Sequence, residues 1–254
     1  MERTSFTLAA ALGGAMLAGA PSLALAQAPA RTAPPRYGSF GDMLGMRAPT
    51  SPPIGRYAGD GVIFVFDRQG GAVQFEGARE IVVLQRQPAP RGGDIYVNDV
   101  GEPVLRIGAT GGMTLFTPDR PQGVPVAFVA PAPPMRLEQM RADIDMLRAM
   151  RSVSAQITRV MGFQRQVSVE APEMPPATWP LLADVLFLTH MAFVKNAGSV
   201  RTKAKMRHID TILVRQGPTP TVRVEGDVLR ITITPAKGVA GRPSSEKIAR
   251  ALAR

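Results

Sequence analysis

The sequence predicts an α+β protein with a small antiparallel β-domain, a sandwich or partial barrel, followed by a C-terminal domain of helices and a β-hairpin. Between residues 60 and 117, short apolar runs recur about every 8 to 12 residues with turn residues between them, as in all-β domains. Further along the chain, apolar residues recur at three- and four-residue steps, which is the spacing of amphipathic helices.

Residues 1–26 are expected to be a secretory signal peptide. Arg3 supplies positive charge, the stretch from Phe6 to Ala20 is apolar, and Ala24-Leu25-Ala26 fits the small-residue rule for cleavage before Gln27. The alternative is an uncleaved membrane anchor, but the apolar stretch is short for a membrane span. The sequence therefore predicts a periplasmic protein without a transmembrane span in its mature chain.

Residues 27–58 are expected to be a disordered leader because they hold six prolines and little hydrophobic periodicity. The β-domain is expected at 59–117. Its predicted strands are centred on Val62–Phe66, Val73–Phe75, Ile81–Leu84, Ile95–Val97, Val104–Ile107 and Met113–Phe116. Residues 118–134, with six more prolines, are expected to be a stiff connector that could include a short strand at Val126–Val129.

The C-terminal α+β domain is expected at 135–254 and begins with a helix over 135–161. A second helix over 178–197 has Thr178 as a plausible N-cap and Gly198 in place to end it. Its central stretch is apolar nearly all round but short for a membrane span, which predicts a buried core helix.

The remainder of that domain is expected to be mixed. Residues 201–214 are predicted to be extended, and 221–234 to form a hairpin around Gly226-Asp227. That turn puts Val224 opposite Leu229 and Val222 opposite Ile231. Ser244 is expected to cap a final helix over 245–253.

Three stretches resemble an uncharacterised domain-of-unknown-function family of exported alphaproteobacterial proteins. They are GDIYVNDVGEP at 93–103, GGMTLFTP at 111–118 and GRPSS at 241–245. The resemblance extends over most of the mature chain. It implies export, but it brings no catalytic or binding residues.

Composition restricts the chemistry. The chain has no cysteine, which excludes disulfides, thiolate metal sites, cysteine nucleophiles and a lipoprotein anchor. The formal net charge is +10, and 25 of the 30 basic residues are arginine. Two explanations stay open: the codon bias of a GC-rich genome, and selection for an anionic partner.

The most specific signal is electrostatic. Arg201, Lys203, Lys205 and Arg207 alternate with small or apolar residues, so a strand would place all four cations on one face. The hairpin register adds Arg223 opposite Arg230, a repulsive pair unless an anion lies between them. These six residues are the candidate anion-binding site, for lipid headgroups or cell-wall polymers. The alternative is a solvated edge strand that its charges protect from aggregation.

Catalytic and metal signatures are weak. His190 lies about 120° around its helix from Asp184, so the two do not face each other. His208 and Asp210 would share a strand face and could belong to a hydrolase, although no G-x-S-x-G motif is present. Asp94, Asn98, Asp99 and Glu102 crowd one hairpin, where such residues usually form turns and less often bind Ca²⁺. No metal site, cofactor or nucleic acid is predicted.

The leading hypothesis is a non-catalytic periplasmic envelope protein that binds an anionic envelope component or a protein partner. The alternative hypothesis is a periplasmic hydrolase that uses His208 and Asp210.

Overall fold

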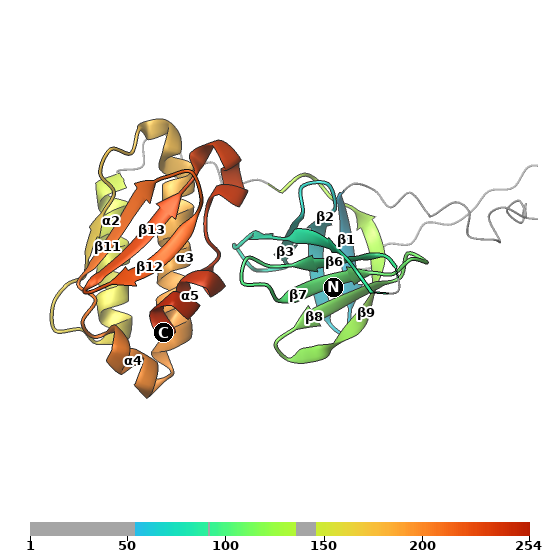
Figure 1. The fold of residues 1–254 in the computed structure, drawn as a ribbon, viewed down its shortest axis with the longest axis horizontal. Helices are drawn as coiled ribbons and strands as arrows, with labels where there is room; N and C mark the ends of the chain where they lie inside the picture. The colour runs from blue at the N-terminus through green and yellow to red at the C-terminus, as the bar shows by residue number, and fades with distance from the viewer. Residues whose placement is uncertain (1–53, 91, 136–145) are drawn as a thin grey trace, which may run out of the picture.

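The computed structural model describes residues 54–90, 92–135 and 146–254, which form a β-domain and a C-terminal domain side by side (Figure 1). The mixed α+β class that the sequence predicts is confirmed. The predicted signal peptide, most of the predicted leader and the first part of the predicted helix 135–161 lie outside the described residues.

The β-domain is one nine-stranded antiparallel sheet that curls into a nearly closed barrel. Its strands are β1 (Ile54–Gly59), β2 (Val62–Asp67), β3 (Ala72–Phe75), β4 (Val82–Val83), β5 (Gln85–Pro88), β6 (Asp94–Val97), β7 (Pro103–Ile107), β8 (Met113–Thr117) and β9 (Arg120–Pro131). The strand order is β4-β3-β2-β1-β9-β8-β7-β6-β5. The edge strands β4 and β5 are consecutive in the chain and separated only by Leu84, so the two edges of the sheet meet there.

Aromatic side chains fill the interior of this barrel. Tyr57 stacks on Phe64 with ring centroids 5.7 Å apart, and Phe66 meets Tyr96 edge to face at 5.0 Å. These rings alternate along their strands with outward-facing residues, as expected for strands with one face in a core. Of the two β architectures that the sequence allowed, the structure has the partial barrel.

The β-domain is longer than predicted at both ends. Residues 54–58, assigned by the sequence to a disordered leader, belong to β1, and the predicted connector contains the twelve-residue strand β9. β9 lies between β1 and β8 in the sheet, and its pairing with β8 shifts register between Leu115 and Thr117. Prolines in this segment suggested a connector because they lack the N–H that a ladder needs. Pro121 lies at this irregularity, whereas Pro125 and Pro131 stand opposite Thr114 and Gly55 within the sheet.

The C-terminal domain packs helices against one face of a four-stranded sheet. Its elements are α2 (Met146–Met161), β10 (Ser168–Glu170), the 3₁₀ turn η1 (Pro176–Thr178), α3 (Trp179–Ala197), α4 (Val200–Met206), β11 (Thr211–Gln216), β12 (Thr221–Glu225), β13 (Val228–Ile233), the 3₁₀ segment η2 (Pro235–Gly241) and α5 (Ser245–Ala253). The sheet order is β10-β11-β13-β12, with β12 antiparallel and the other neighbours parallel.

Two local predictions are confirmed in this domain. The hairpin pairs Val224 with Leu229 and Val222 with Ile231, and Gly226 has the positive φ of 63° that its turn requires. Ser244 caps α5, because its hydroxyl accepts the backbone N–H of Lys247 at 3.0 Å.

Helix α3 is the centre of the C-terminal core, as predicted. Leu182, Leu186 and Phe193 are buried against α2, α5 and the sheet. By length and composition the helical segment Pro176–Ala197 would be sufficient to cross a membrane, but more than half of it is buried inside the fold. A helix with this much protein around it serves as a core helix.

The end of α3 differs from the prediction. Gly198 has right-handed helical angles (φ −72°, ψ −18°) in place of the left-handed turn expected at this glycine. The chain continues directly into α4, which is capped by the Ser199 hydroxyl accepting the N–H of Thr202. The predicted extended segment 201–214 is therefore helical in its first half, and only β11 is extended.

Candidate functional site

A cleft of about 680 Å³ lies where the two domains meet. Residues of the barrel line one side, and Lys195 of α3 with the start of α5 lines the other. Ligand sites in proteins commonly lie at such domain junctions, in cavities of this size. The cleft is therefore the candidate functional site.

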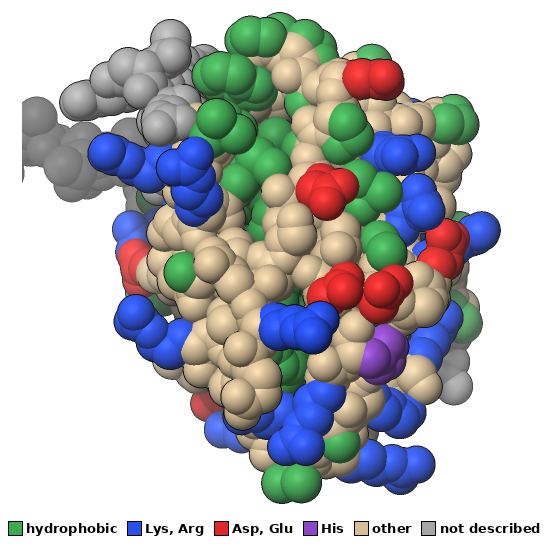
Figure 2. All heavy atoms as spheres, turned by 90° about the vertical axis from the view of Figure 1, so that its left-hand side faces the viewer, with side chains coloured by type: hydrophobic (Ala, Val, Ile, Leu, Met, Phe, Trp, Pro, Cys, Tyr) green, Lys and Arg blue, Asp and Glu red, His purple; other side chains and the backbone are tan. Residues whose placement is uncertain are grey.

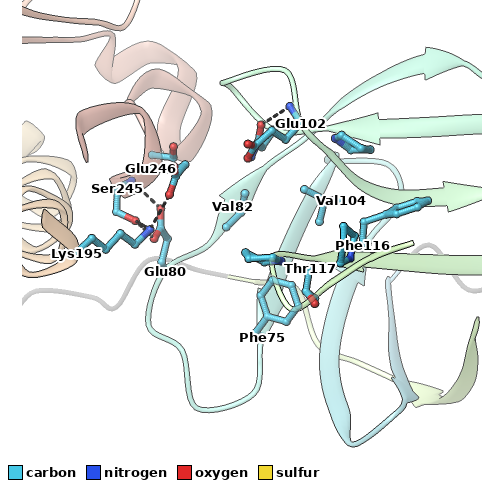
Figure 3. A pocket seen from close by; sticks show the side chains of 15 residues that line it. Phe75, Glu80, Val82, Glu102, Val104, Phe116, Thr117, Lys195, Ser245 and Glu246 are labelled. Atoms are coloured by element: carbon cyan, nitrogen blue, oxygen red, sulfur yellow. Dashed lines mark hydrogen bonds and ion pairs between the residues drawn. The ribbon is translucent and has the colours of Figure 1, made fainter. Parts of the chain in front are cut away.

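The barrel side of the cleft is mostly apolar. Phe75, Val82, Val104 and Phe116 come from four different strands, and prolines 103, 118 and 121 extend the wall. Figure 3 shows the four labelled apolar side chains opposite Lys195, Ser245 and Glu246 of the C-terminal domain. A wall of this kind suits the apolar part of a ligand.

The opposite side of the cleft is polar. The ammonium group of Lys195 donates to the Ser245 hydroxyl at 2.9 Å and lies 3.3 Å from the Glu246 carboxylate. Glu80 reaches over from the barrel to Ser245, while Glu102 pairs with Arg250 of α5 (Figure 3 labels all of these except Arg250). Three carboxylates and one ammonium thus line the cleft itself.

Carboxylates of the barrel also hold the N-terminus of α5. The backbone N–H of Ser244 donates to Asp99 at 2.8 Å, and that of Ser245 donates to Glu80 at 2.9 Å. The Ser244 hydroxyl also donates to Asp99, and the Ser245 hydroxyl also donates to Glu80. Unpaired N–H groups and the helix dipole favour negative charge at this end, so the barrel supplies caps that α5 needs.

A buried ion pair lies beside this contact. Arg242 pairs with Asp184 of α3, and their side chains are only 1% and 8% exposed. Arg242 also donates to the backbone carbonyl of Ile81 in the barrel at 3.0 Å. Burial raises the pKa of the Asp184 carboxyl above its ordinary value, and the guanidinium of Arg242 opposes that rise.

The triplet Lys195–Ser245–Glu80 superficially suggests a serine nucleophile with a lysine base. Such a lysine has to accept a proton from the hydroxyl. Here Lys195 instead donates to the hydroxyl and makes an ion pair with Glu246, while Ser245 is almost fully buried and gives its own hydrogen to Glu80. This geometry joins the domains, and it does not activate Ser245.

We expect the double variant Glu80→Gln, Asp99→Asn to loosen the contact between the domains. Each capping interaction of this type contributes about 1 kcal/mol, and an amide is a weaker acceptor than a carboxylate. The radius of gyration from small-angle X-ray scattering should increase. The matched control Glu173→Gln, Asp119→Asn changes the charge equally at two exposed positions and should leave the radius unchanged; equal radii for both variants would contradict the assignment.

The predicted basic strand is the helix α4. Its cations therefore do not share one strand face: successive residues turn by about 100°, which separates Arg201 and Lys205 from Lys203 and Arg207. Alternation over seven residues suggested a strand, but Lys, Arg and Ala are strong helix formers and Ser199 supplies the cap.

The other two predicted anion-site residues lie elsewhere, on the hairpin. Arg223 stands directly opposite Arg230, as predicted. Arg230 donates to the carboxylate of Glu225 at 2.9 Å, so an acidic side chain of the same hairpin relieves the repulsion.

The predicted hydrolase pair does not share a strand face. His208 lies in the turn after α4, and Asp210 precedes β11; both are exposed. The Asp210 carboxylate accepts the hydroxyl of its neighbour Thr211 at 2.9 Å. His190 is half-buried on α3, and this burial lowers its pKa. Asp184, six residues earlier, is paired with Arg242.

The polar hairpin residues have structural partners. Asn98 accepts backbone N–H groups of Val100 and Glu102, which is the turn role that the sequence suggested. Asp94 pairs with Arg86 at 2.8 Å. Within residues 54–90, 92–135 and 146–254, no group of three or more His, Asp or Glu side chains is placed to hold a metal ion.

The cleft itself was not predicted. Glu80 and Lys195 carried no motif, and Arg242 belonged to a stretch that carried only the family resemblance. The contacts between the domains join residues 145 to 165 positions apart. One signal was present: Asp184 interrupts an otherwise apolar helix, and a buried carboxylate needs a partner.

Comparison with known proteins places the chain in a family. No curated protein and no solved structure matches the chain. A family described as "Domain of unknown function (DUF4908)" matches residues 39–252 and so includes both domains and all three stretches that carried the resemblance. Two of those stretches supply Asp99 and Ser244, which meet at the contact between the domains. The chain therefore belongs to the DUF4908 family.

Proposed function

We propose that this protein is an exported, non-catalytic binding protein of the bacterial periplasm whose ligand occupies the cleft between its domains. The observation that carries the proposal is the cavity of about 680 Å³, which has an apolar wall from one domain and polar groups from the other. A ligand in this position would contact both domains at once.

The lining indicates the chemistry of the ligand. Phe75, Val82, Val104 and Phe116 suit an apolar body, whereas Glu102 and Glu246 offer acceptor oxygens. Glu102 and Glu246 already pair with Arg250 and Lys195, and Glu80 accepts from Ser245. The remaining lone pairs of these carboxylates can still accept, so the polar end of the ligand should donate hydrogen bonds. A small amphiphilic molecule of that kind is the proposed ligand class.

A binding role fits the polar groups better than catalysis does. The serine hydroxyls of the cleft are engaged in the contact between the domains, and the exposed His208 and Asp210 lie on the segment around α4. The hydrolase hypothesis therefore loses the shared strand face that motivated it.

The predicted signal peptide supports the periplasmic part of the proposal. The signal-like residues 1–26 predict a mature chain that begins at Gln27. An intact mass beginning at Gln27 in the periplasmic fraction is the expected result, and a chain retaining Met1 in the cytoplasm would contradict it.

The binding part is tested with the neutral fluorophore N-phenyl-1-naphthylamine as the probe. Thr117→Trp should fill part of the cleft and weaken binding of the probe about tenfold, equivalent to ~1.4 kcal/mol. The matched control Thr114→Trp adds the same bulk to the same strand at a position that does not line the cleft, and it should bind like the wild type. Equal affinities of the two variants, or no binding of the probe at all, would reject the cleft as the ligand site.

A further inference from the structure

Helix α4 exposes an apolar residue among cations. The side chain of Val200 is 86% exposed, while Met206 on the other side of the helix is fully buried in the core. An exposed valine at the start of a short helix contributes nothing to the packing of its own domain. The side chains that flank Val200 on α4 therefore indicate what kind of partner this residue would contact.

The helix places two pairs of cations on either side of a small apolar ridge. At about 100° per residue, Val200 and Ala204 lie one turn apart and form the ridge. Arg201 and Lys205 flank it on one side, and Lys203 and Arg207 flank it on the other. The residues that the sequence arranged on one strand face thus surround an outward-facing apolar strip.

The helix lies at one end of the C-terminal domain. Lysine and arginine side chains gather at the lower end of the face in Figure 2, where Figure 1 shows α4. Lys205 is held by the backbone carbonyls of Ala253 and Arg254 at 2.9 and 2.8 Å. The acidic residues Asp210 and Asp227 come after the helix in the chain, and the backbone N–H of Asp210 donates to the carbonyl of Asp227 at 3.0 Å.

We propose that α4 docks this protein on the surface of an anionic lipid bilayer, with Val200 in the interface and Arg201, Lys203 and Arg207 at the headgroups. Cations alone would suit any polyanion. The apolar ridge between them favours a bilayer, because only a bilayer offers an apolar phase beneath its charged surface. This inference rests on α4 alone and is independent of the cleft.

The test measures partitioning of the processed chain, beginning at Gln27, onto vesicles of phosphatidylcholine with an equal part of phosphatidylglycerol. The variant Arg201→Gln, Lys203→Gln, Arg207→Gln should bind roughly 100-fold more weakly, since each cation near such a surface contributes about a factor of five. Lys205 is left in place because it holds the end of α5. The control Arg120→Gln, Arg151→Gln, Arg215→Gln removes equal charge at three exposed positions and should retain most of the binding.

Val200→Ser distinguishes a bilayer from a soluble polyanion. It should weaken binding to the vesicles by about threefold to tenfold, because a partly buried valine is lost, and leave binding to dextran sulfate unchanged. Unchanged secondary structure in far-ultraviolet circular dichroism confirms that the variants fold. Equal losses in the two triple variants, an unaffected Val200→Ser, or no binding of the wild type to these vesicles would each overturn the proposal.

Discussion

Arg242→Met should destabilise the C-terminal domain by about 3–5 kcal/mol, because it leaves the carboxylate of Asp184 buried without its cation. The guanidinium is 1% exposed and also donates to the carbonyl of Ile81, so the substitution removes a charge partner and a link to the barrel. Trp179, the single tryptophan, lies at the start of α3 and reports unfolding of this domain in urea.

The variant should also acquire a distinctive dependence on pH. Burial already raises the pKa of Asp184, and without Arg242 only the weaker effect of the Arg79 charge opposes that rise. A carboxyl whose pKa is higher in the folded state than the unfolded value of about 3.9 stabilises the fold fully only below that value. The stability of Arg242→Met should therefore fall as the pH rises through the folded-state pKa of Asp184.

The double variant Asp184→Leu, Arg242→Met is the control for the ion pair. Replacing both charges with apolar side chains removes the stranded carboxylate, and such exchanges are often neutral or stabilising. It should recover most of the lost stability and lose the added pH dependence. If the free energy of unfolding of Arg242→Met is within about 0.5 kcal/mol of the wild-type value, the ion pair does not contribute to stability.

Phe193→Ala should cost about 3–5 kcal/mol, and Leu186→Ala about 2–5 kcal/mol, because both leave cavities in the centre of the C-terminal core. Both side chains are buried on α3, and Phe193 meets Phe163 edge to face at 6.5 Å. Urea unfolding followed by Trp179 fluorescence measures these losses.

Val194→Ala is the matched control on the same helix. Val194 is adjacent to Phe193 but 40% exposed, so its truncation should change the free energy of unfolding by less than about 0.5 kcal/mol. Comparable costs at positions 193 and 194 would contradict the orientation of α3 in the core.

The sequence by itself determined the elements whose signals are local. The hairpin register follows from Gly226-Asp227, because a two-residue turn fixes which residues face each other. The final helix follows from Ser244, whose hydroxyl satisfies an N–H of the first turn. Helix α3 follows from a long apolar stretch that begins after Thr178 and Pro180.

Only the tertiary structure decided the elements whose signals were ambiguous over short distances. The alternating cations at 201–207 fit a strand face and a helix equally, and the cap at Ser199 with the burial of Met206 selected the helix. The prolines of 120–131 suggested a connector, but pairing with β1 and β8 on both sides held the segment as β9.

The cleft depended on tertiary structure entirely. Asp99 and Glu80 bind the start of α5 across 145 and 165 residues, and nothing in the local sequence of a carboxylate specifies so distant a partner. Local patterns fix backbone conformation because they act through neighbouring residues. The geometry of a site that joins two domains is determined only when both domains are folded and their unpaired polar groups form hydrogen bonds with each other.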